Sequence, residues 1–123
     1  MNIANRDAVT AFITKDTSVI REILAPKGSD ISRQSLAEAT LPPGASTVAH
    51  SHPDTEEIYY ILVGDGLMAI EAERRAVGRG DAVGILPGQM HQIRNTGSAD
   101  LVFLCCCVPA YSDADTVMCA PLL

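Results

Sequence analysis

The sequence contains few cationic side chains and no long apolar run. Lys and Arg together number 9 against 15 Asp and Glu, which gives a formal net charge of −6. A chain with this balance repels a phosphate backbone, so we do not expect a nucleic-acid partner. No apolar segment approaches the roughly 18 residues of a membrane span, and the first residues lack a basic start followed by an apolar stretch. We therefore expect a cytoplasmic protein that does not act at a membrane.

The sequence also lacks a Cys-x-x-Cys pair, although it has four cysteines. Cys105, Cys106 and Cys107 are consecutive within an apolar run, and Cys119 stands apart. Adjacent side chains of an extended strand point to opposite faces, so consecutive cysteines cannot bridge one another without distorting the backbone. We expect reduced cysteines that pack as small apolar side chains, one of which can face the domain interior. A bridge from Cys119 to this run is the alternative.

Proline and glycine divide the chain into segments of about strand length, which are too short for a series of helices. A length of 123 residues suits a single domain. Regularly spaced short strands with turns between them indicate a β-sandwich or barrel. The predicted strands are residues 32–41, 46–52, 57–63, 67–72, 81–85, 90–95 and 101–108.

Three further segments lie outside or between these strands. Residues 16–24 are expected to form a strand with a turn, and residues 71–74 a turn. Residues 109–123 carry two prolines and no clear period, so we expect a tail that wraps the surface or a partner subunit.

All three histidines of the sequence lie in one pattern with a glutamate. Residues two apart on a strand share a face, so His50 and His52 project in the same direction. Glu57 opens the next predicted strand after a four-residue connection, which can return its carboxylate to the pair. His91 belongs to a third strand, and the glycines before it allow tight turns that bring that strand across. We therefore predict that His50, His52, Glu57 and His91 form a metal site.

Three neutral imidazoles and one carboxylate suit one divalent first-row transition metal per chain. Five or six coordination then leaves open positions for a substrate. Iron, manganese, zinc, nickel and copper all satisfy this ligand set, so the sequence does not select among them. One negative ligand beside a dication leaves net positive charge, which favours a small anionic or oxygen-rich molecule.

The spacing of these residues resembles the two motifs of the cupin superfamily. The first motif is met by Gly44, His50, His52, Glu57 and Gly64, and the second by Gly80, Gly88, His91 and Asn95. The family interval that ends at Gly64 favours Glu57 over its neighbour Glu56 as the ligand. Only the proline of the second motif departs, since it stands at Pro87, one residue later than in the family. We expect Asn95 to form a turn rather than to bind metal.

The resemblance covers residues 32–108. It implies an all-β fold, a double-stranded β-helix or jelly-roll (cupin) barrel, with the metal inside the barrel mouth. Residues 1–123 then form a single cupin domain, with a barrel core at about 32–108 and a tail at 109–123. The N-terminal arm, residues 1–31, would carry a short irregular or helical segment. Family members commonly form homodimers, so we expect one here.

Tyr59 is the candidate catalytic residue. It lies two residues after Glu57 and shares its face, so it can hydrogen-bond to a substrate or donate a proton. The alternative is an interior aromatic side chain that packs the barrel. Tyr60 is expected to point the opposite way, into a sheet or dimer contact. Tyr111 lies beyond the last strand, where it can cover the barrel mouth or only the tail.

The resemblance leaves three functions open, because one fold serves many activities. The first is a metal-dependent isomerase, lyase or decarboxylase that acts on a sugar-like or keto-acid metabolite through a Lewis-acid ion. The second is an iron- or copper-dependent dioxygenase. The third is a metabolite-sensing module without catalysis. The first is favoured because the ligand set is complete and leaves positive charge at the site.

Overall fold

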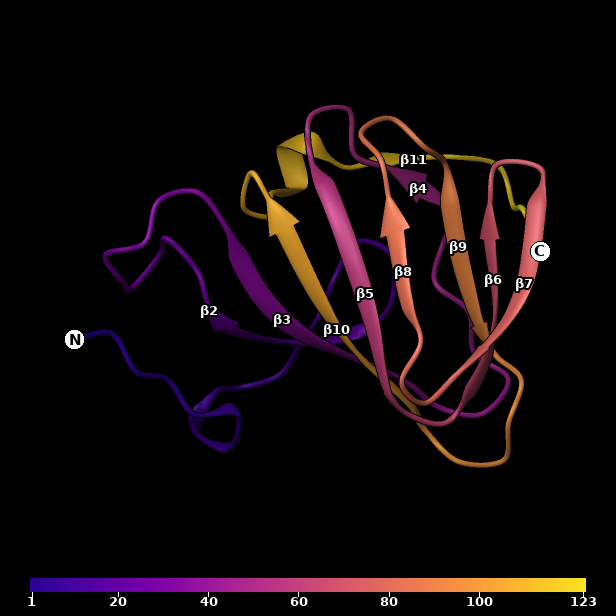
Figure 1. Cartoon of the computed structure of the whole chain (residues 1–123), viewed down its shortest axis with the longest axis horizontal. Helices are drawn as coiled ribbons and strands as arrows, with labels where there is room; N and C mark the ends of the chain where they lie inside the picture. Colours follow the sequence, from indigo (N-terminus) through magenta and orange to yellow (C-terminus); the bar gives the residue numbers. More distant parts are fainter.

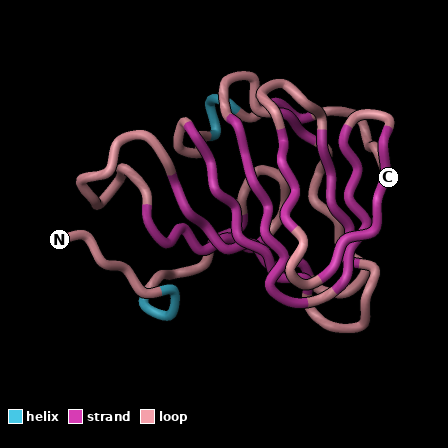
Figure 2. The backbone as a smooth tube through the Cα atoms, in the orientation of Figure 1, coloured by secondary structure: helices cyan, strands magenta, loops and turns pink.

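Two antiparallel β-sheets make up nearly all regular structure in the computed structural model, which describes residues 1–123 (Figures 1 and 2). The six-stranded sheet has the order β1 (Phe12–Ile13), β2 (Val19–Leu24), β3 (Ser35–Leu41), β10 (Leu101–Val108), β5 (Glu56–Val63) and β8 (Ala82–Ile85). The five-stranded sheet has the order β11 (Val117–Met118), β4 (His50–Ser51), β9 (His91–Asn95), β6 (Asp65–Ile70) and β7 (Glu73–Gly78). The only helical elements are the 3-10 turns η1 (Arg6–Ala8) and η2 (Asp113–Asp115). The predicted all-β jelly-roll fold is confirmed, as is a short helical segment in the N-terminal arm.

Buried and exposed side chains alternate along β5 and β10, and the buried ones form the core between the two sheets. In β5 the side chains of Glu57, Tyr59 and Ile61 are buried, whereas Ile58 and Tyr60 are exposed. The same period of two buries alternate residues of β10, which lies between β3 and β5. The hydrophobic core cluster consists of Ala39, Leu41, Tyr59, Ile61, Met68, Ile85, Ile93, Leu101, Phe103 and Cys105.

Most of the predicted strands are present. Apart from the two-residue strands β1 and β11, which were not predicted, there are two differences. The segment predicted at residues 46–52 is largely irregular: Ser46 makes an isolated bridge to Arg94, and only β4 is a strand. The second difference is β7, which was not predicted. Its first residues, including Glu73, Arg74 and Arg75, are exposed, so they lack the apolar alternation by which a strand is recognised. The turn expected at residues 71–74 is shorter, with Glu71 at a φ of +51°.

Gly64 and Asn95 secure the end of the barrel opposite the histidines. Gly64 has a φ of +91°, and a Cβ there would lie 2.6 Å from the carbonyl oxygen of Asp100. The Asn95 amide donates to the carbonyls of Leu41 (2.9 Å) and Ala99 (2.8 Å), and its oxygen accepts from the Gly97 N–H. Asn95 therefore forms a turn, as predicted.

Both ends of the chain extend the sheets. In the arm, Thr14 to Thr17 form a turn before β2, which agrees with the strand and turn expected at residues 16–24. The tail returns across the five-stranded sheet, where β11 pairs with β4 and the last two N–H groups donate to Gln92 Oε1. The tail thus wraps the surface of its own chain. None of the helical segments has the length and apolar character needed to cross a membrane.

Candidate metal centre

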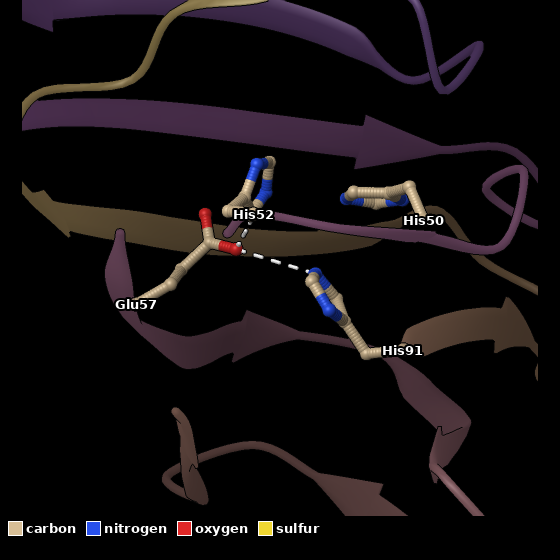
Figure 3. A group of neighbouring side chains, drawn as sticks. All are labelled: His50, His52, Glu57 and His91. Atoms are coloured by element: carbon tan, nitrogen blue, oxygen red, sulfur yellow. Dashed lines mark ion pairs between the residues drawn. The ribbon is translucent and has the colours of Figure 1, made fainter. Parts of the chain in front are cut away.

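The four predicted ligands come together between the two sheets (Figure 3). His50 lies on β4 and His91 opposite it on β9, since the two are register partners. His52 follows β4, and Glu57 reaches the group from β5 in the other sheet. All four side chains are buried, and the candidate ligand atoms lie within 4.8 Å of one another. The structure therefore assembles a group that could hold one metal ion.

Hydrogen bonds to carbonyl groups orient each imidazole. The Nδ1 atom of His50 lies 2.7 Å from the carbonyl oxygen of Val48, and that of His91 lies 3.0 Å from the carbonyl of Gln89. His52 Nδ1 lies 3.2 Å from the carbonyl of Asp115. A carbonyl oxygen only accepts, so the neutral rings carry their proton on Nδ1 and leave the Nε2 lone pair free. Carbonyl partners of this kind fix the tautomer and orientation of metal-binding histidines.

The carboxylate of Glu57 faces two of these free nitrogens. Its Oε1 atom lies 3.5 Å from His52 Nε2 and 3.4 Å from His91 Nε2. Glu57 Oε1 and His91 Nε2 are buried side-chain atoms without a hydrogen-bond partner. Orphaned buried polar atoms are rare because each costs free energy. A divalent cation among them would satisfy both atoms, so the residues present fit a metal ion.

The charge states of the group are set by burial and by mutual attraction. Burial by itself would raise the pKa of Glu57, but interaction with His52 and His91 outweighs it and lowers the pKa to about 2. Burial lowers the pKa of His50, and the nearby His91 ring acts in the same direction. Burial also opposes charge on His52, yet attraction to Glu57 prevails and raises its pKa. Glu57 is thus an anion and His50 a neutral donor near pH 7.

A cavity opens beside the candidate ligands, and His50, His52 and Glu57 line it. Its walls come mainly from the inner face of β2, β3, β5 and β10 and from the N-terminal arm. Three acidic side chains line it, Asp16, Glu22 and Glu57, and no lysine or arginine does. The cavity is therefore lined mainly by apolar surface, and three carboxylates also face it. Positive charge in the cavity would come from a bound ion or from protonation of His52, whose pKa is raised.

Tyr59 lines this cavity but packs closely within it. Its ring lies 5.9 Å from the His91 ring and 4.6 Å from Phe103, and the side chain is 2% exposed. Burial raises the pKa of its hydroxyl well above the usual value, so the group stays protonated. It makes no side-chain hydrogen bond within the chain. The geometry of Tyr59 thus agrees with an interior aromatic side chain that packs the barrel. Its hydroxyl is still free to hydrogen-bond to a ligand.

The two other tyrosines differ in exposure and in their surroundings. Tyr60 faces outward and is 42% exposed. Tyr111 lines the cavity, with its ring 5.9 Å from that of His52 and its hydroxyl donating to Asp113 at 2.8 Å. Tyr111 therefore forms part of the cavity wall and does not contact only the tail.

The cysteines are all free thiols, as expected, and no bridge joins Cys119 to β10. Two of the three consecutive cysteines line the cavity, Cys105 and Cys107. The Cys107 thiol lies opposite Glu57 in the β10–β5 register and donates to Glu57 Oε2 at 3.0 Å. The sequence did not reveal this contact. Alternation puts residues 105 and 107 on one face, but only the pairing of β10 with β5 brings Cys107 to the carboxylate.

Asp16 is the second residue that the sequence did not reveal. Its Oδ2 atom lies 3.7 Å from His50 Nε2, although it belongs to the N-terminal arm and to no recognisable motif. With Asp16 included, a dication would be balanced by two carboxylates. The net positive charge expected from Glu57 alone is therefore offset, and the preference of the site for anions is weaker than the ligand set implied.

The family model for the cupin domain matches residues 37–107 of this chain. This chain belongs to the cupin family. The match includes the four candidate ligands and most of both sheets, whereas Asp16 and Tyr111 lie outside it. The cupin barrel thus supplies the ligand group, and the segments that flank it complete the cavity.

Three similar proteins illustrate the range of this family. The uncharacterized protein MJ1618 of Methanocaldococcus jannaschii is 47% identical over 110 residues, which cover 89% of this chain and 88% of that protein. The oxalate-binding protein of Thermotoga maritima is 41% identical over 69 residues, 56% of this chain and 57% of that protein. Among solved structures, a predicted oxalate decarboxylase from Thermotoga maritima superposes with a TM-score of 0.78 at 26% identity, covering 88% of this chain and 99% of that chain.

Proposed function

We propose that this cupin is a metal-dependent enzyme that acts on a small oxygen-rich metabolite bearing a carboxylate. One divalent ion would be held by His50, His52, His91 and Glu57. The observation that carries the proposal is the pair of orphaned atoms, Glu57 Oε1 and His91 Nε2, buried beside two further oriented imidazoles at the side of a cavity. Iron, manganese, zinc, nickel and copper all suit this donor set.

A bound dication would act as a Lewis acid that polarises a carbonyl or carboxylate oxygen of the substrate, as isomerase, lyase and decarboxylase reactions require. The chain itself supplies the environment. The cavity walls exclude water from the reacting group, which strengthens electrostatic interactions there. Tyr59 is proposed as the hydrogen-bond or proton donor, because its hydroxyl remains protonated and lacks a partner within the chain.

The relatives support a carboxylate-bearing ligand of keto-acid or related type. One of them binds oxalate by its name, and a similar solved structure is described as a predicted oxalate decarboxylase. The first name also favours a second candidate function, a binding or sensing protein without turnover. A metal-anchored carboxylate would be bound in both cases, so the two functions differ only in whether the bound molecule then reacts.

Turnover measurements on defined metal forms would test the proposal. The metal-free protein is reloaded separately with iron(II), manganese, zinc, nickel and copper, and each form is incubated with keto acids, hydroxy acids and aldose or ketose sugars. We expect turnover by at least one form and none by His91→Ala, which lacks one ligand. Binding without turnover would favour the sensing function. Oxygen uptake that depends on substrate would identify a dioxygenase, and neither binding nor turnover by fully loaded protein would refute the proposal.

We also propose that the protein is a cytoplasmic homodimer. Its four cysteines are free, which suits a reducing compartment. Apolar side chains stand exposed on the outer face of the six-stranded sheet, including Ile58 and Tyr60 on β5 and Val108 on β10. A second copy of the chain would cover them. Light scattering after size-exclusion chromatography should give twice the monomer mass, and a monomer mass at micromolar concentration would refute the dimer.

A further inference from the structure

Asp16 is held against the metal centre by the N-terminal arm. The arm turns sharply between Thr14 and Thr17, which has a φ of +74°. The N–H of Val48 donates to the Asp16 carbonyl at 2.7 Å and so joins this turn to the segment that leads into His50. The Asp16 side chain is only 14% exposed. Its carboxylate is therefore part of the cavity wall rather than a mobile surface group.

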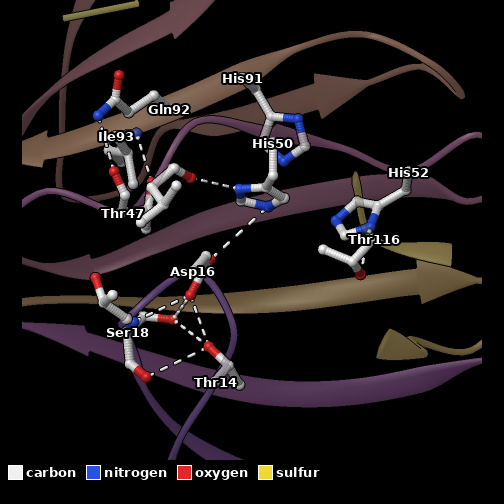
Figure 4. Close-up of polar contacts among 12 residues, drawn as sticks. Thr14, Asp16, Ser18, Thr47, His50, His52, His91, Gln92, Ile93 and Thr116 are labelled. Atoms are coloured by element: carbon white, nitrogen blue, oxygen red, sulfur yellow. Dashed lines mark hydrogen bonds and ion pairs between the residues drawn. The ribbon is translucent and has the colours of Figure 1, made fainter. Parts of the chain in front are cut away.

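The two oxygens of this carboxylate have different environments (Figure 4). Oδ1 accepts three hydrogen bonds: from the Thr14 hydroxyl at 2.6 Å, from the Ser18 hydroxyl at 2.5 Å and from the Ser18 N–H at 3.0 Å. Oδ2 has no hydrogen bond and faces His50 Nε2 at 3.7 Å. One oxygen thus anchors the side chain and the other is directed at the ligand group.

The facing atoms, Asp16 Oδ2 and His50 Nε2, are both acceptors. His50 donates its ring proton to the Val48 carbonyl, so Nε2 presents a lone pair. Two acceptors that face each other repel unless a cation or a proton donor lies beside them. A metal ion held by His50 Nε2 would remove this repulsion at the nitrogen. Oδ2, 3.7 Å from that nitrogen, would then face a ligand bound to the ion. Such a ligand is stabilised if it donates a hydrogen bond.

We infer that Asp16 is a specificity-determining residue that accepts a hydrogen bond from a hydroxyl of the metal-bound ligand. The site then takes hydroxycarboxylates or polyhydroxy carbonyl compounds in preference to ligands that present only carboxylates. The inference rests on the proposed function, because it requires a metal-anchored ligand. The absence of lysine and arginine from the cavity supports it, since no other side chain would neutralise a second carboxylate there.

Glycolate and oxalate make a suitable pair of probes. Both chelate a metal through a five-membered ring, but glycolate offers a hydroxyl where oxalate offers a second carboxylate. Zinc-loaded protein is titrated calorimetrically with each, and zinc retention is checked by elemental analysis afterwards. The variants are Asp16→Asn, which keeps the size of the side chain, and Asp16→Ala. Glu22→Gln is the matched control, because it removes a charge from the same cavity without a contact to a histidine.

The measured quantity is the preference for glycolate over oxalate, expressed as the ratio of the two dissociation constants. A charge-assisted hydrogen bond and the repulsion of a second carboxylate together predict that this preference falls about tenfold or more in Asp16→Asn and Asp16→Ala. Glu22→Gln should retain the wild-type preference within about twofold. Zinc content and melting temperature should stay close to those of the wild type in all three variants.

Four outcomes would overturn the inference. An unchanged preference in both Asp16 variants would show that Oδ2 does not contact the ligand. An equal fall of the glycolate preference in Glu22→Gln would show that the effect comes from the overall charge of the cavity and not from Asp16 itself. Loss of zinc from the Asp16 variants would make Asp16 a metal ligand instead. Zinc-loaded wild type that binds neither probe would contradict the carboxylate ligand of the proposed function, and the inference would fail with it.

Discussion

Cys107 controls the orientation of the Glu57 carboxylate. Its thiol donates to Oε2 at 3.0 Å, which leaves Oε1 directed at His52 and His91. Burial and the negative charge of Glu57 both raise the pKa of this thiol, so it stays a proton donor. Partners of this kind typically change metal affinity by about 10–100-fold when they are removed.

We predict that Cys107→Ala weakens metal binding by about tenfold or more. Cys107→Ser keeps a donor at the same place and should bind metal nearly as the wild type does. Cys105→Ala is the control, because Cys105 lines the same cavity without a hydrogen bond to Glu57. Competition with a fluorescent chelator measures all four dissociation constants. Equal affinity in Cys107→Ala and Cys105→Ala would contradict this role.

The sequence predicted the group of candidate ligands but not the contacts of the residues that surround it, for a physical reason. His50, His52 and Glu57 lie within eight positions of one another, so strand geometry alone relates them. The contacts of Cys107 and Asp16 depend on which strands pair and on where the arm runs. Cys107 is 50 positions from Glu57 in the sequence, and Asp16 is 34 positions from His50. No local sequence pattern encodes contacts over such separations.

Among the connections between strands, the turn from β5 to β6 requires a glycine, both for its backbone conformation and because a neighbouring backbone leaves no room for a Cβ. Gly64 combines a φ of +91° with a backbone oxygen 2.6 Å from the place of a Cβ. Gly84 in β8 has neither feature, since nothing lies within 4 Å of such a Cβ. The two glycines therefore form a matched pair for substitution.

Gly64→Ala is expected to lower the free energy of unfolding by about 2–4 kcal/mol, because the positive φ and the clash with the Asp100 carbonyl both add strain. Gly84→Ala should change it by less than about 1 kcal/mol. Urea denaturation of the two variants beside the wild type measures both values. Similar stability in the two variants would show that the turn at Gly64 adapts at low cost.

The strands that the sequence predicted well are those with one buried face. β5 and β10 alternate between buried and exposed positions, and their bounds agree with the prediction within one residue. β7 was missed because it lies at the edge of the five-stranded sheet and exposes charged side chains. β4 is shorter than predicted because the backbone groups of the segment before it form hydrogen bonds outside a regular strand ladder. One example is the Thr47 N–H, which donates to the Ile93 carbonyl.

For the molecule as a whole, a bound metal ion would compete with protons for one buried cluster of titratable side chains. In the metal-free protein the pKa of His52 is raised and that of Glu57 is lowered, so at pH values below the raised pKa a protonated His52 pairs with a Glu57 anion. The stabilisation from His52 is fully present below its unfolded pKa, near 6.5, and is lost as pH rises through the higher folded value. A metal ion must displace that proton in order to bind.

We therefore predict that metal affinity falls as pH is lowered from 8 to 6, by up to about tenfold for each pH unit once His52 is protonated. Binding should release protons in the same range. Calorimetric titrations in two buffers with different ionisation enthalpies measure the affinity and the number of protons released. An affinity that does not change with pH, and binding without proton release, would contradict the charge states described here.

The flanking segments give this cupin its particular cavity. The barrel matched by the family model supplies the four candidate metal ligands. Asp16 comes from the arm before it, and Tyr111 from the tail after it. The tail also holds His52, through the Asp115 carbonyl and the Thr116 hydroxyl. We therefore expect the choice of small-molecule ligand to depend on the N-terminal arm and the C-terminal tail, the two segments for which the sequence pattern was least informative.

Elemental analysis of protein purified without affinity metals or chelators measures whether the four side chains hold a metal ion. We predict about one equivalent of a divalent first-row metal in the wild type and a large loss in His50→Ala, whose melting temperature confirms that it is folded. Equal metal content in the two proteins would contradict the site. So would a wild type that binds no iron, manganese, zinc, nickel or copper after incubation with each.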